Sequence, residues 1–264
     1  MDRPLLIFDG QTAQLIPAIR RPGNVHDSRN VVPVLRRLVR LWRARWPGVV
    51  IEARADSGFA TPRLYTFCER AGLTYTIGLV PNACLERIAA PRLAQAVQQQ
   101  AETGAEKVRL AGDGSYQAGS WDRARRVVFK AEALVKGPHT RFVVTNRPDA
   151  PLALDDFSVD RGEPENWVKD FKRACFADRL SCCRFLANQV RLFLHAAAYT
   201  LLDALRRRLV AAGAERLQLD TRRLRLLKIG GWVKPRARDF RLRLATSHPG
   251  EPLWRLLAAS ATAS

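Results

Sequence analysis

The chain has 264 residues and 47% of them are apolar, which is enough for a buried core and excludes a disordered protein. Its 44 Lys and Arg residues exceed its 25 Asp and Glu residues and leave a formal charge of +19. An excess of this size favours a polyanionic partner, with nucleic acid ahead of an anionic membrane. The longest mostly apolar run, residues 192–202, is too short to span a bilayer, so we expect no transmembrane segment.

The first 81 residues alternate between strand and helix patterns, which is typical of an α/β sheet with an antiparallel edge. An Asp-Gly pair between two apolar runs predicts a hairpin at the start. Arg36, Arg40 and Arg43 form a stripe on the first predicted helix, which is either a solvated face or a DNA contact. The predicted elements are, in chain order, strands at 4–9 and 13–20, a helix at 26–48 capped near Asp27 or Ser28, a strand at 49–54, a helix at 61–72 and a strand at 73–79.

The next segment, residues 82–150, differs from the first 81 residues in its pattern of helix and strand signals. A Gln-rich helix pattern at 92–102 is followed by short strand patterns at 107–112, 125–132 and 141–146, with Gly and aromatic residues between them. Short strands separated by turn residues predict an inserted antiparallel β unit.

A long helix is predicted from Cys182 to Val210. Its apolar residues recur at helical spacing, so we expect them to face the core. The tail at 221–245 mixes basic residues with Trp232 and Phe240 in alternation, which predicts a basic hairpin on the surface. The apolar residues predicted to face the core are Leu186, Val190, Phe193, Ala197, Leu201 and Leu205.

Five cysteines stand at positions 68, 84, 175, 182 and 183, and no two of them have the Cys-x-x-Cys spacing of a zinc or redox site. We therefore expect reduced and buried thiols, which suits a cytosolic protein.

Asp56 is the first acidic residue placed to carry chemistry. It lies one residue past a predicted strand, in the sequence RADSGF. Functional groups collect beyond the carboxyl ends of strands in open α/β sheets, because the loops there share a crevice above rigid backbone. The alternative is structural, since an Asp before Ser57 and Gly58 also suits a capped turn.

Glu165 is the second candidate and lies in the first turn of a helix predicted to begin at residue 163. The helix dipole favours a carboxylate there without any function. Glu165, Lys169 and Lys172 share one helical face, and Arg161 stands one step before the helix. Such a face suits surface ion pairs, and equally a metal-binding carboxylate beside cations that hold phosphate.

The chain resembles the DDE transposases of bacterial insertion sequences over nearly its whole length, in the segments RADSGFATPRLYTFCERAGLTYTIGL, RGEPENWVKDFK and FADRLSCCRFLANQVRLFLHAAAY. The branch concerned carries a tyrosine, arginine, glutamate, lysine signature. Arg161, Glu165 and Lys172 match the last three positions, whereas Ser158 replaces the tyrosine. Asp56 matches the second acidic residue of the family, which glycine more often precedes.

The resemblance implies a ribonuclease-H-like mixed sheet with flanking helices and a β-rich insertion. It implies a first part of the catalytic core at 1–81, the insertion at 82–150, a second part of the core at 151–212 and a basic C-terminal segment at 213–264.

The function that the resemblance implies is metal-dependent phosphodiester cleavage and strand transfer at insertion-sequence ends. Such chemistry uses two divalent ions held by carboxylates, and Mg²⁺ suits hard oxygen ligands. Asp56 and Glu165 would be ligands, with Arg161 and Lys172 on phosphate. The implied partners are transposon ends and target DNA, a second copy of the chain on DNA and no membrane, in the bacterial cytoplasm at the nucleoid. The alternative is a non-catalytic DNA-binding remnant or regulator of transposition.

The first acidic residue of the family should lie on a strand that two further strands follow before the first helix. Here only two strands are predicted before that helix, so Asp9 is followed by one strand, and its Asp-Gly pair is sufficiently explained by a turn. We expect a chain that starts after the family's first strand, lacks the first catalytic Asp and is inactive alone. Asp9 as a substitute third ligand stays open.

Overall fold

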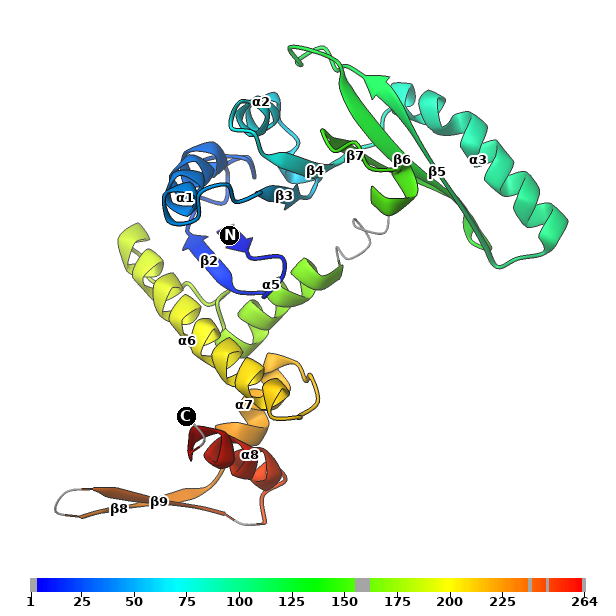
Figure 1. Ribbon diagram of the computed structural model, residues 1–264. Coiled ribbons are helices and arrows are strands. Elements are labelled where there is room, and N and C mark those ends of the chain that lie inside the picture. Colours follow the sequence, from blue (N-terminus) through cyan, green and yellow to red (C-terminus); the bar gives the residue numbers. More distant parts are fainter. Residues whose placement is uncertain (1–3, 155–161, 237–238, 246, 263–264) are drawn as a thin grey trace. The chain divides into compact units, whose positions relative to one another are not determined.

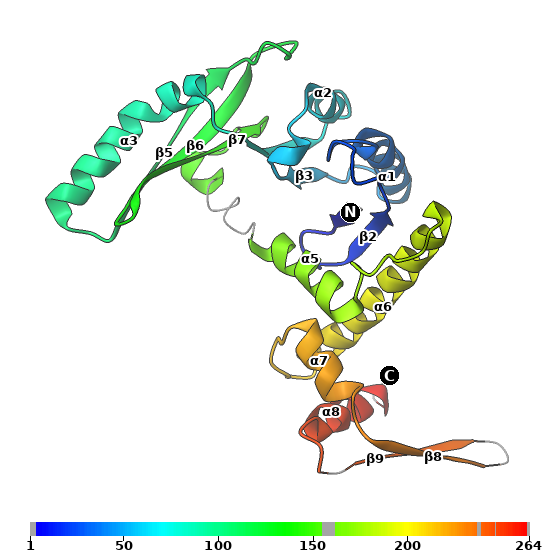
Figure 2. The same ribbon diagram turned by 180° about the vertical axis from the view of Figure 1, so that it is seen from behind.

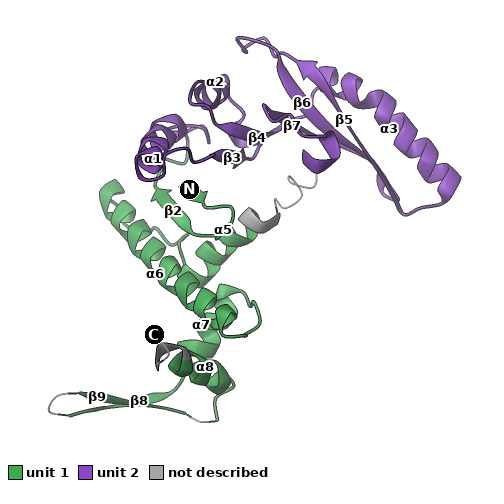
Figure 3. Ribbon diagram, in the orientation of Figure 1, with its two compact units in different colours: residues 1–23, 162–264 green, residues 24–161 purple. Residues whose placement is uncertain are grey.

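The computed structural model describes the chain except for residues 1–3, 155–161, 237–238, 246 and 263–264. Figures 1 and 2 show the helices and strands from two sides. The chain divides into two compact units, of which unit 1 comprises residues 1–23 and 162–264 and unit 2 comprises residues 24–161 (Figure 3). The predicted domain boundaries at 81, 150 and 212 stay predictions.

Unit 2 is built on one five-stranded mixed sheet with helices against it (Figure 1). The strand order is β3-β4-β7-β6-β5, in which β3 and β4 are parallel and every other pair is antiparallel. The strands are β3 (Glu52–Ala55), β4 (Thr74–Leu79), β5 (Lys107–Tyr116), β6 (Arg125–Leu134) and β7 (Gly137–Thr145), and the helices are α1 (Val31–Arg45), α2 (Pro62–Arg70) and α3 (Ala83–Thr103).

The predicted antiparallel strands of the insertion are confirmed, but they do not form a separate sheet. β7 pairs with β4, so β5, β6 and β7 continue the sheet that β3 and β4 begin. Helix α3 packs against β5, β6 and β7, which buries nearly all of β6. The parallel pair therefore belongs to a wide, well-packed sheet, which gives the loop after β3 a rigid base.

A buried carboxylate lies on β6, between β7 and the edge strand β5. Glu132 of β6 is 4% exposed and pairs with Lys107 at 2.8 Å, Arg109 at 3.2 Å and Lys130 at 3.5 Å. Burial acts to raise the pKa of Glu132, but the three cations outweigh it and hold that pKa at about 2. The charged form of Glu132 therefore stabilises the fold.

We expect this stabilisation to disappear in acid. Because the folded pKa of Glu132 lies below its ordinary value of 4.5, its contribution is complete above that pH and is lost as the pH falls towards 2. The substitution Glu132→Gln should lower the free energy of unfolding by about 3 kcal/mol at pH 6, since it leaves buried cations without their counter-charge. Urea unfolding of both proteins should show the difference shrinking between pH 5 and 2.5, and a difference independent of pH would contradict the assignment.

Unit 1 packs a β-hairpin against helices. Phe8 and Ala18 of the hairpin meet Phe171, Leu192 and Tyr199 in one apolar core. The predicted hairpin near the start is confirmed. The basic hairpin predicted for the tail is confirmed over residues 231–244, but its predicted start is wrong, because Leu219–Leu226 form a helix. The elements are β1 (Leu5–Phe8), β2 (Leu15–Ile19), α5 (Gly162–Cys175), α6 (Phe185–Ala211), α7 (Leu219–Leu226), β8 (Gly231–Pro235), β9 (Phe240–Leu244) and α8 (Glu251–Thr262).

The predicted core face of α6 is wrong. Leu186 is 76% exposed and Leu201 is 72% exposed, and the neighbouring Val190 and Phe193 are exposed as well. The helix instead buries a face that alternates apolar and polar side chains, namely Asn188, Leu192, Tyr199, Asp203, Arg206 and Leu209.

The polar members of the buried face have partners, which is why they can lie inside. Asn188 exchanges two hydrogen bonds with the backbone of Cys182, at 2.8 and 2.9 Å. Arg206 pairs with Asp203 and, at 3.4 Å, with Asp170 of α5. Buried polar groups are tolerated when they are satisfied in this way, so apolar periodicity alone selected the opposite face.

All five cysteines are free thiols. Burial raises the pKa of Cys68 to about 12 and that of Cys175 to about 11, so both stay protonated. The prediction of burial is wrong for Cys84 and Cys183, which are exposed. Within the described residues, no helix combines the length and apolarity that a membrane span requires.

Candidate active site

Asp56 stands at the carboxyl end of β3, where β3 runs parallel to β4. The side chain is exposed, and its Oδ1 accepts a hydrogen bond of 2.9 Å from the backbone N–H of Gly58. The turn-capping role considered from the sequence is therefore present. Within the described part of the chain, the second carboxylate oxygen has no hydrogen bond or ion pair, so one oxygen fixes the turn and the other is available to a ligand.

A second carboxylate lies beside Asp56. A Cβ placed on Gly58 would be 2.7 Å from Oδ2 of Asp27 and 3.1 Å from Oδ1 of Asp56, so both carboxylates border this glycine. The predicted helix cap at Asp27 or Ser28 is wrong, because α1 begins after Asn30. Sequence reasoning missed Asp27 as a site residue, since nothing in the local pattern places it against a loop 29 residues further along.

The turn after Asp56 packs closely against β4. A Cβ on Gly78 of β4 would lie 3.0 Å from the backbone N of Ser57. The two glycines therefore permit a close approach that a side chain would block. This packing holds Asp56 in one position at the edge of the sheet.

The space around Gly58 can be tested by substitution. We expect Gly58→Ala to lower the free energy of unfolding by about 1 kcal/mol, because its methyl group would overlap the Asp27 carboxylate. Gly119→Ala is the control, since nothing lies within 4 Å of a Cβ there. In a double-mutant cycle measured by urea unfolding, Asp27→Ala should remove most of the cost of Gly58→Ala. Strictly additive effects would contradict the proposed overlap.

Helix α5 carries Glu165, Lys169 and Lys172 on its solvent-exposed face. The opposite face is anchored by Trp167, whose ring lies 5.8 Å from that of Phe8, and by other core residues. The predicted common face is confirmed, because side chains four and three residues apart lie above one another on a helix. Among the described residues, none forms an ion pair with these three side chains, so the ion-pair alternative finds no support there.

Two positions of the signature, Arg161 and Ser158, fall outside the described residues. Asp56 belongs to unit 2 and Glu165 to unit 1. That Asp56 and Glu165 share a metal stays a prediction.

Asp9 is engaged in the turn between β1 and β2. Its Oδ1 accepts hydrogen bonds from the N–H groups of Gln11 at 3.2 Å and Thr12 at 2.7 Å, and from the hydroxyl of Thr12 at 2.6 Å. Partial burial acts to raise the pKa of Asp9, but these hydrogen bonds lower it below its ordinary value. The hydrogen bonds support the turn explanation of Asp9 over the ligand explanation.

The carboxylates of Asp27 and Asp56 in unit 2 offer oxygen donors, which Mg²⁺ prefers, and Glu165 of unit 1 offers the same kind of donor. Within the described residues of the chain, no group of three or more His, Cys, Asp or Glu side chains is arranged to hold a metal ion.

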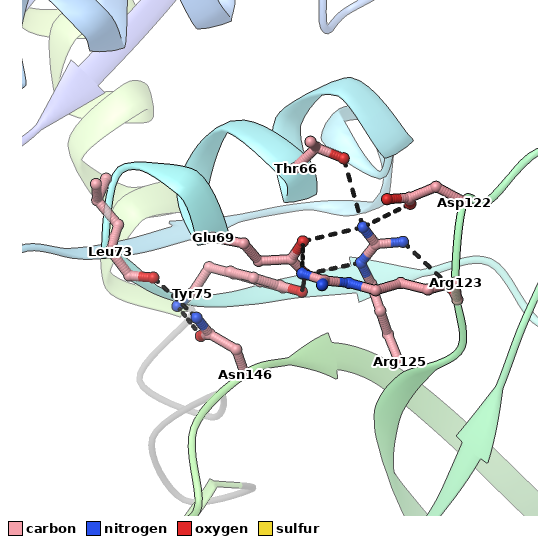
Figure 4. Close-up of polar contacts among 8 residues, drawn as sticks. All are labelled: Thr66, Glu69, Leu73, Tyr75, Asp122, Arg123, Arg125 and Asn146. Carbon is pink, nitrogen blue, oxygen red and sulfur yellow. Dashed lines mark hydrogen bonds and ion pairs between the residues drawn. The ribbon is translucent and has the colours of Figure 1, made fainter.

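A partly buried ion-pair network fixes helix α2, which follows the Asp56 turn (Figure 4). The guanidinium of Arg125 contacts Glu69 at 2.8 and 3.0 Å and Asp122 at 2.8 Å. Tyr75 donates its hydroxyl to Glu69 at 2.9 Å. These contacts tie α2 to β4 and β6, so the network, hereafter the Arg125 network, gives the Asp56 loop a rigid support.

The tail forms a two-stranded ribbon, β8 and β9, whose two faces differ. Trp232 and Lys234 lie opposite Arg243 and Arg241, so three cations and an indole share one face. The guanidinium of Arg243 lies 5.9 Å from the Trp232 ring. Apolar residues, including Val233, occupy the other face, and both strands are exposed almost throughout.

Comparison with protein families gives a match over nearly the whole chain. The family model described as Transposase DDE domain group 1 matches residues 3–262. No curated protein matches the sequence.

Proposed function

Because the chain belongs to the transposase DDE domain family that matches it over residues 3–262, we propose that it supplies active-site residues for the cleavage and transfer of DNA strands at the ends of a bacterial insertion sequence. The observation that carries the proposal is the placement of Asp56. It is an exposed carboxylate at the carboxyl end of a parallel strand, with one oxygen fixed by the turn and the other available. The carboxyl ends of strands are where α/β sheets place their functional groups.

In this proposal each residue has a distinct role. Asp56 and Glu165 are metal ligands, and Arg161 and Lys172 hold phosphate oxygens. Divalent ions such as Mg²⁺, when bound, supply Lewis-acid stabilisation of the attacking and leaving oxygens of the phosphodiester. The Arg125 network keeps the Asp56 loop in place, and Trp167 keeps the exposed face of α5 turned away from the core of unit 1.

The finer assignments belong to the same proposal. The mixed sheet with an acidic residue after a parallel strand supports a ribonuclease-H-like core. The offsets of Arg161, Glu165 and Lys172 support the signature branch of insertion-sequence transposases. A homodimer on DNA and association with the bacterial nucleoid follow from that assignment and from the charge of +19.

Iron-directed cleavage of the polypeptide tests the shared metal site. Fe²⁺ replaces Mg²⁺ at oxygen-ligand sites and, with ascorbate and peroxide, generates radicals that cut nearby backbone. We expect cuts near both residue 56 and residue 165, and competition by excess Mg²⁺. Glu165→Gln should remove the cuts near Asp56 as well as its own. Cuts near only one residue, or cuts near 56 that persist in Glu165→Gln, would contradict a shared site.

The second candidate function, DNA binding without catalysis as a regulator of transposition, is favoured by the ribbon. Its basic face carries Lys234, Arg241 and Arg243 beside Trp232 and is far from both acidic candidates in the sequence. A two-stranded ribbon fits the major groove of DNA. Specific DNA binding together with an absence of metal-directed cuts would select this function over the first.

A further inference from the structure

A groove between α1 and α2 is lined by cationic side chains. It encloses a volume of about 600 Å³ within unit 2. Arg36 of α1 and Arg63 and Arg70 of α2 line it, and Ser120 and Asp122 close one side from the segment before β6. The groove therefore gathers three guanidinium groups from two helices.

These three arginines have no structural partner among the described residues. Arg36, Arg63 and Arg70 are exposed, and none has a hydrogen bond or ion pair with another residue in the described part of the chain. Arg43, which shares the predicted stripe with Arg36, differs: its guanidinium donates to the carbonyl of Ala71 at 2.6 Å. Of the predicted stripe, Arg43 thus has a structural role and Arg36 lines the groove, whereas Arg40 does not line it.

The single carboxylate of the groove does not neutralise them. Asp122 is held by Arg125 at 2.8 Å, and hydrogen bonding to that guanidinium lowers the pKa of Asp122. Arg125 is itself buried in its network. The charge of Asp122 is therefore already compensated, and the groove keeps a net positive charge.

The length and position of the groove match a strand of DNA. Arg63 and Arg70 are seven residues apart, so they are separated by about 10 Å along the helix axis. Phosphates of one strand recur at about 3.4 Å along the axis of B-DNA, so this distance spans about three of them. The Arg63 end of α2 follows the Asp56 turn directly.

We propose that this groove binds the backbone phosphates of the DNA strand that leads to Asp56. The inference rests on the proposed function for the identity of the strand and adds to it a binding surface and a polarity, with Arg63 nearer the reacting phosphate than Arg70. Arginine suits this role because its planar fork binds phosphate oxygens in pairs. An acidic segment of another protein is the competing occupant, and the test below distinguishes it from DNA.

The test compares two triple variants with the same change of charge. Arg36→Gln, Arg63→Gln and Arg70→Gln together remove the cations of the groove. Arg37→Gln, Arg45→Gln and Arg87→Gln remove three exposed arginines of unit 2 that do not line it. Binding of the full chain to a labelled DNA duplex is measured in EDTA over a range of NaCl concentrations, after thermal unfolding has shown that both variants are folded.

We expect the groove variant to bind DNA at least tenfold more weakly at about 0.1 M salt. Each phosphate contact contributes about −0.9 to the slope of log affinity against log salt, so the slope should become shallower by two to three. The control variant should change the slope by less than one. Single Arg63→Gln should change it by about one. Equal affinities and slopes for the two triple variants would overturn the proposal and leave an acidic protein segment as the occupant.

This outcome is independent of catalysis. Binding is measured without divalent metal, so the result does not depend on the proposed cleavage step. If the groove variant weakens DNA binding as expected but the iron-directed cuts are absent, the proposed chemistry is rejected and the groove is retained. If the cuts appear but the groove variant binds DNA like the control variant, the groove is rejected and the chemistry is retained.

Discussion

In a chain extended at its N-terminus by a strand that carries the family's first Asp, Asp56→Asn is expected to abolish divalent-metal-dependent cleavage of DNA that carries the insertion-sequence ends, with a loss of rate of at least about a thousandfold. Replacing one carboxylate oxygen by an amide removes an anionic ligand, and about 4 kcal/mol of lost transition-state stabilisation corresponds to that factor. Glu165→Gln should have an effect of the same size. The measurement is end cleavage of labelled DNA at a fixed Mg²⁺ concentration.

Matched substitutions show whether the effect is local. Asp178→Asn and Glu106→Gln change exposed carboxylates outside the candidate site, and we expect them to retain activity within about twofold. The iron-directed cuts give a second readout that does not require turnover. Cleavage at the parent rate by either Asp56→Asn or Glu165→Gln would remove that residue from the site.

Arg125→Ala is expected to lower the free energy of unfolding by about 3 to 4 kcal/mol, the largest stability effect that we anticipate in unit 2. Its side chain is 3% exposed, and its loss would leave Glu69 and Asp122 without their central partner. It also lies over the rings of Tyr65 and Trp121, at 5.2 and 5.6 Å. Removal therefore loses cation–π contacts as well as ion pairs.

The control for Arg125 is Arg92→Ala, which removes an exposed arginine whose partner is Gln95 of the same helix. This change should cost less than about 0.5 kcal/mol. Arg125→Lys should recover little of the loss, because a single ammonium does not replace a bidentate fork. Urea unfolding that showed Arg125→Ala to be as stable as Arg92→Ala would exclude the Arg125 network as a support of the sheet.

Local signals in the sequence predicted the elements well where the physical cause was local. The Asp-Gly pair before β2 and the Pro at the first turn of α2 each act within a few residues. The common face of Glu165, Lys169 and Lys172 follows from helical geometry alone. The offset from Arg161 to Lys172 likewise needed no tertiary information.

The errors arose where distant contacts decide the outcome. Helix α6 has apolar residues on two faces, and the face with Asn188 and Asp203 is buried because those side chains find partners in other segments or on the same helix. Asp27 borders Gly58 through packing between separate elements. β7 joins β4 by a pairing across more than sixty residues, which no local pattern encodes.

The division into two units also sets an order of events during synthesis. Unit 2 is one continuous stretch, whereas unit 1 needs residues from both sides of it. The backbone N–H of Arg20 donates to Gln189 at 2.7 Å, and the hydroxyl of Tyr199 donates to the carbonyl of Ala13 at 3.0 Å, so these bonds form only after unit 2 has left the ribosome. A folded unit 2 shortens the loop that they close and so reduces its entropic cost. The nascent β1 and β2 must wait meanwhile, and any variant that slows the folding of unit 2 leaves their apolar surface exposed to aggregation for longer.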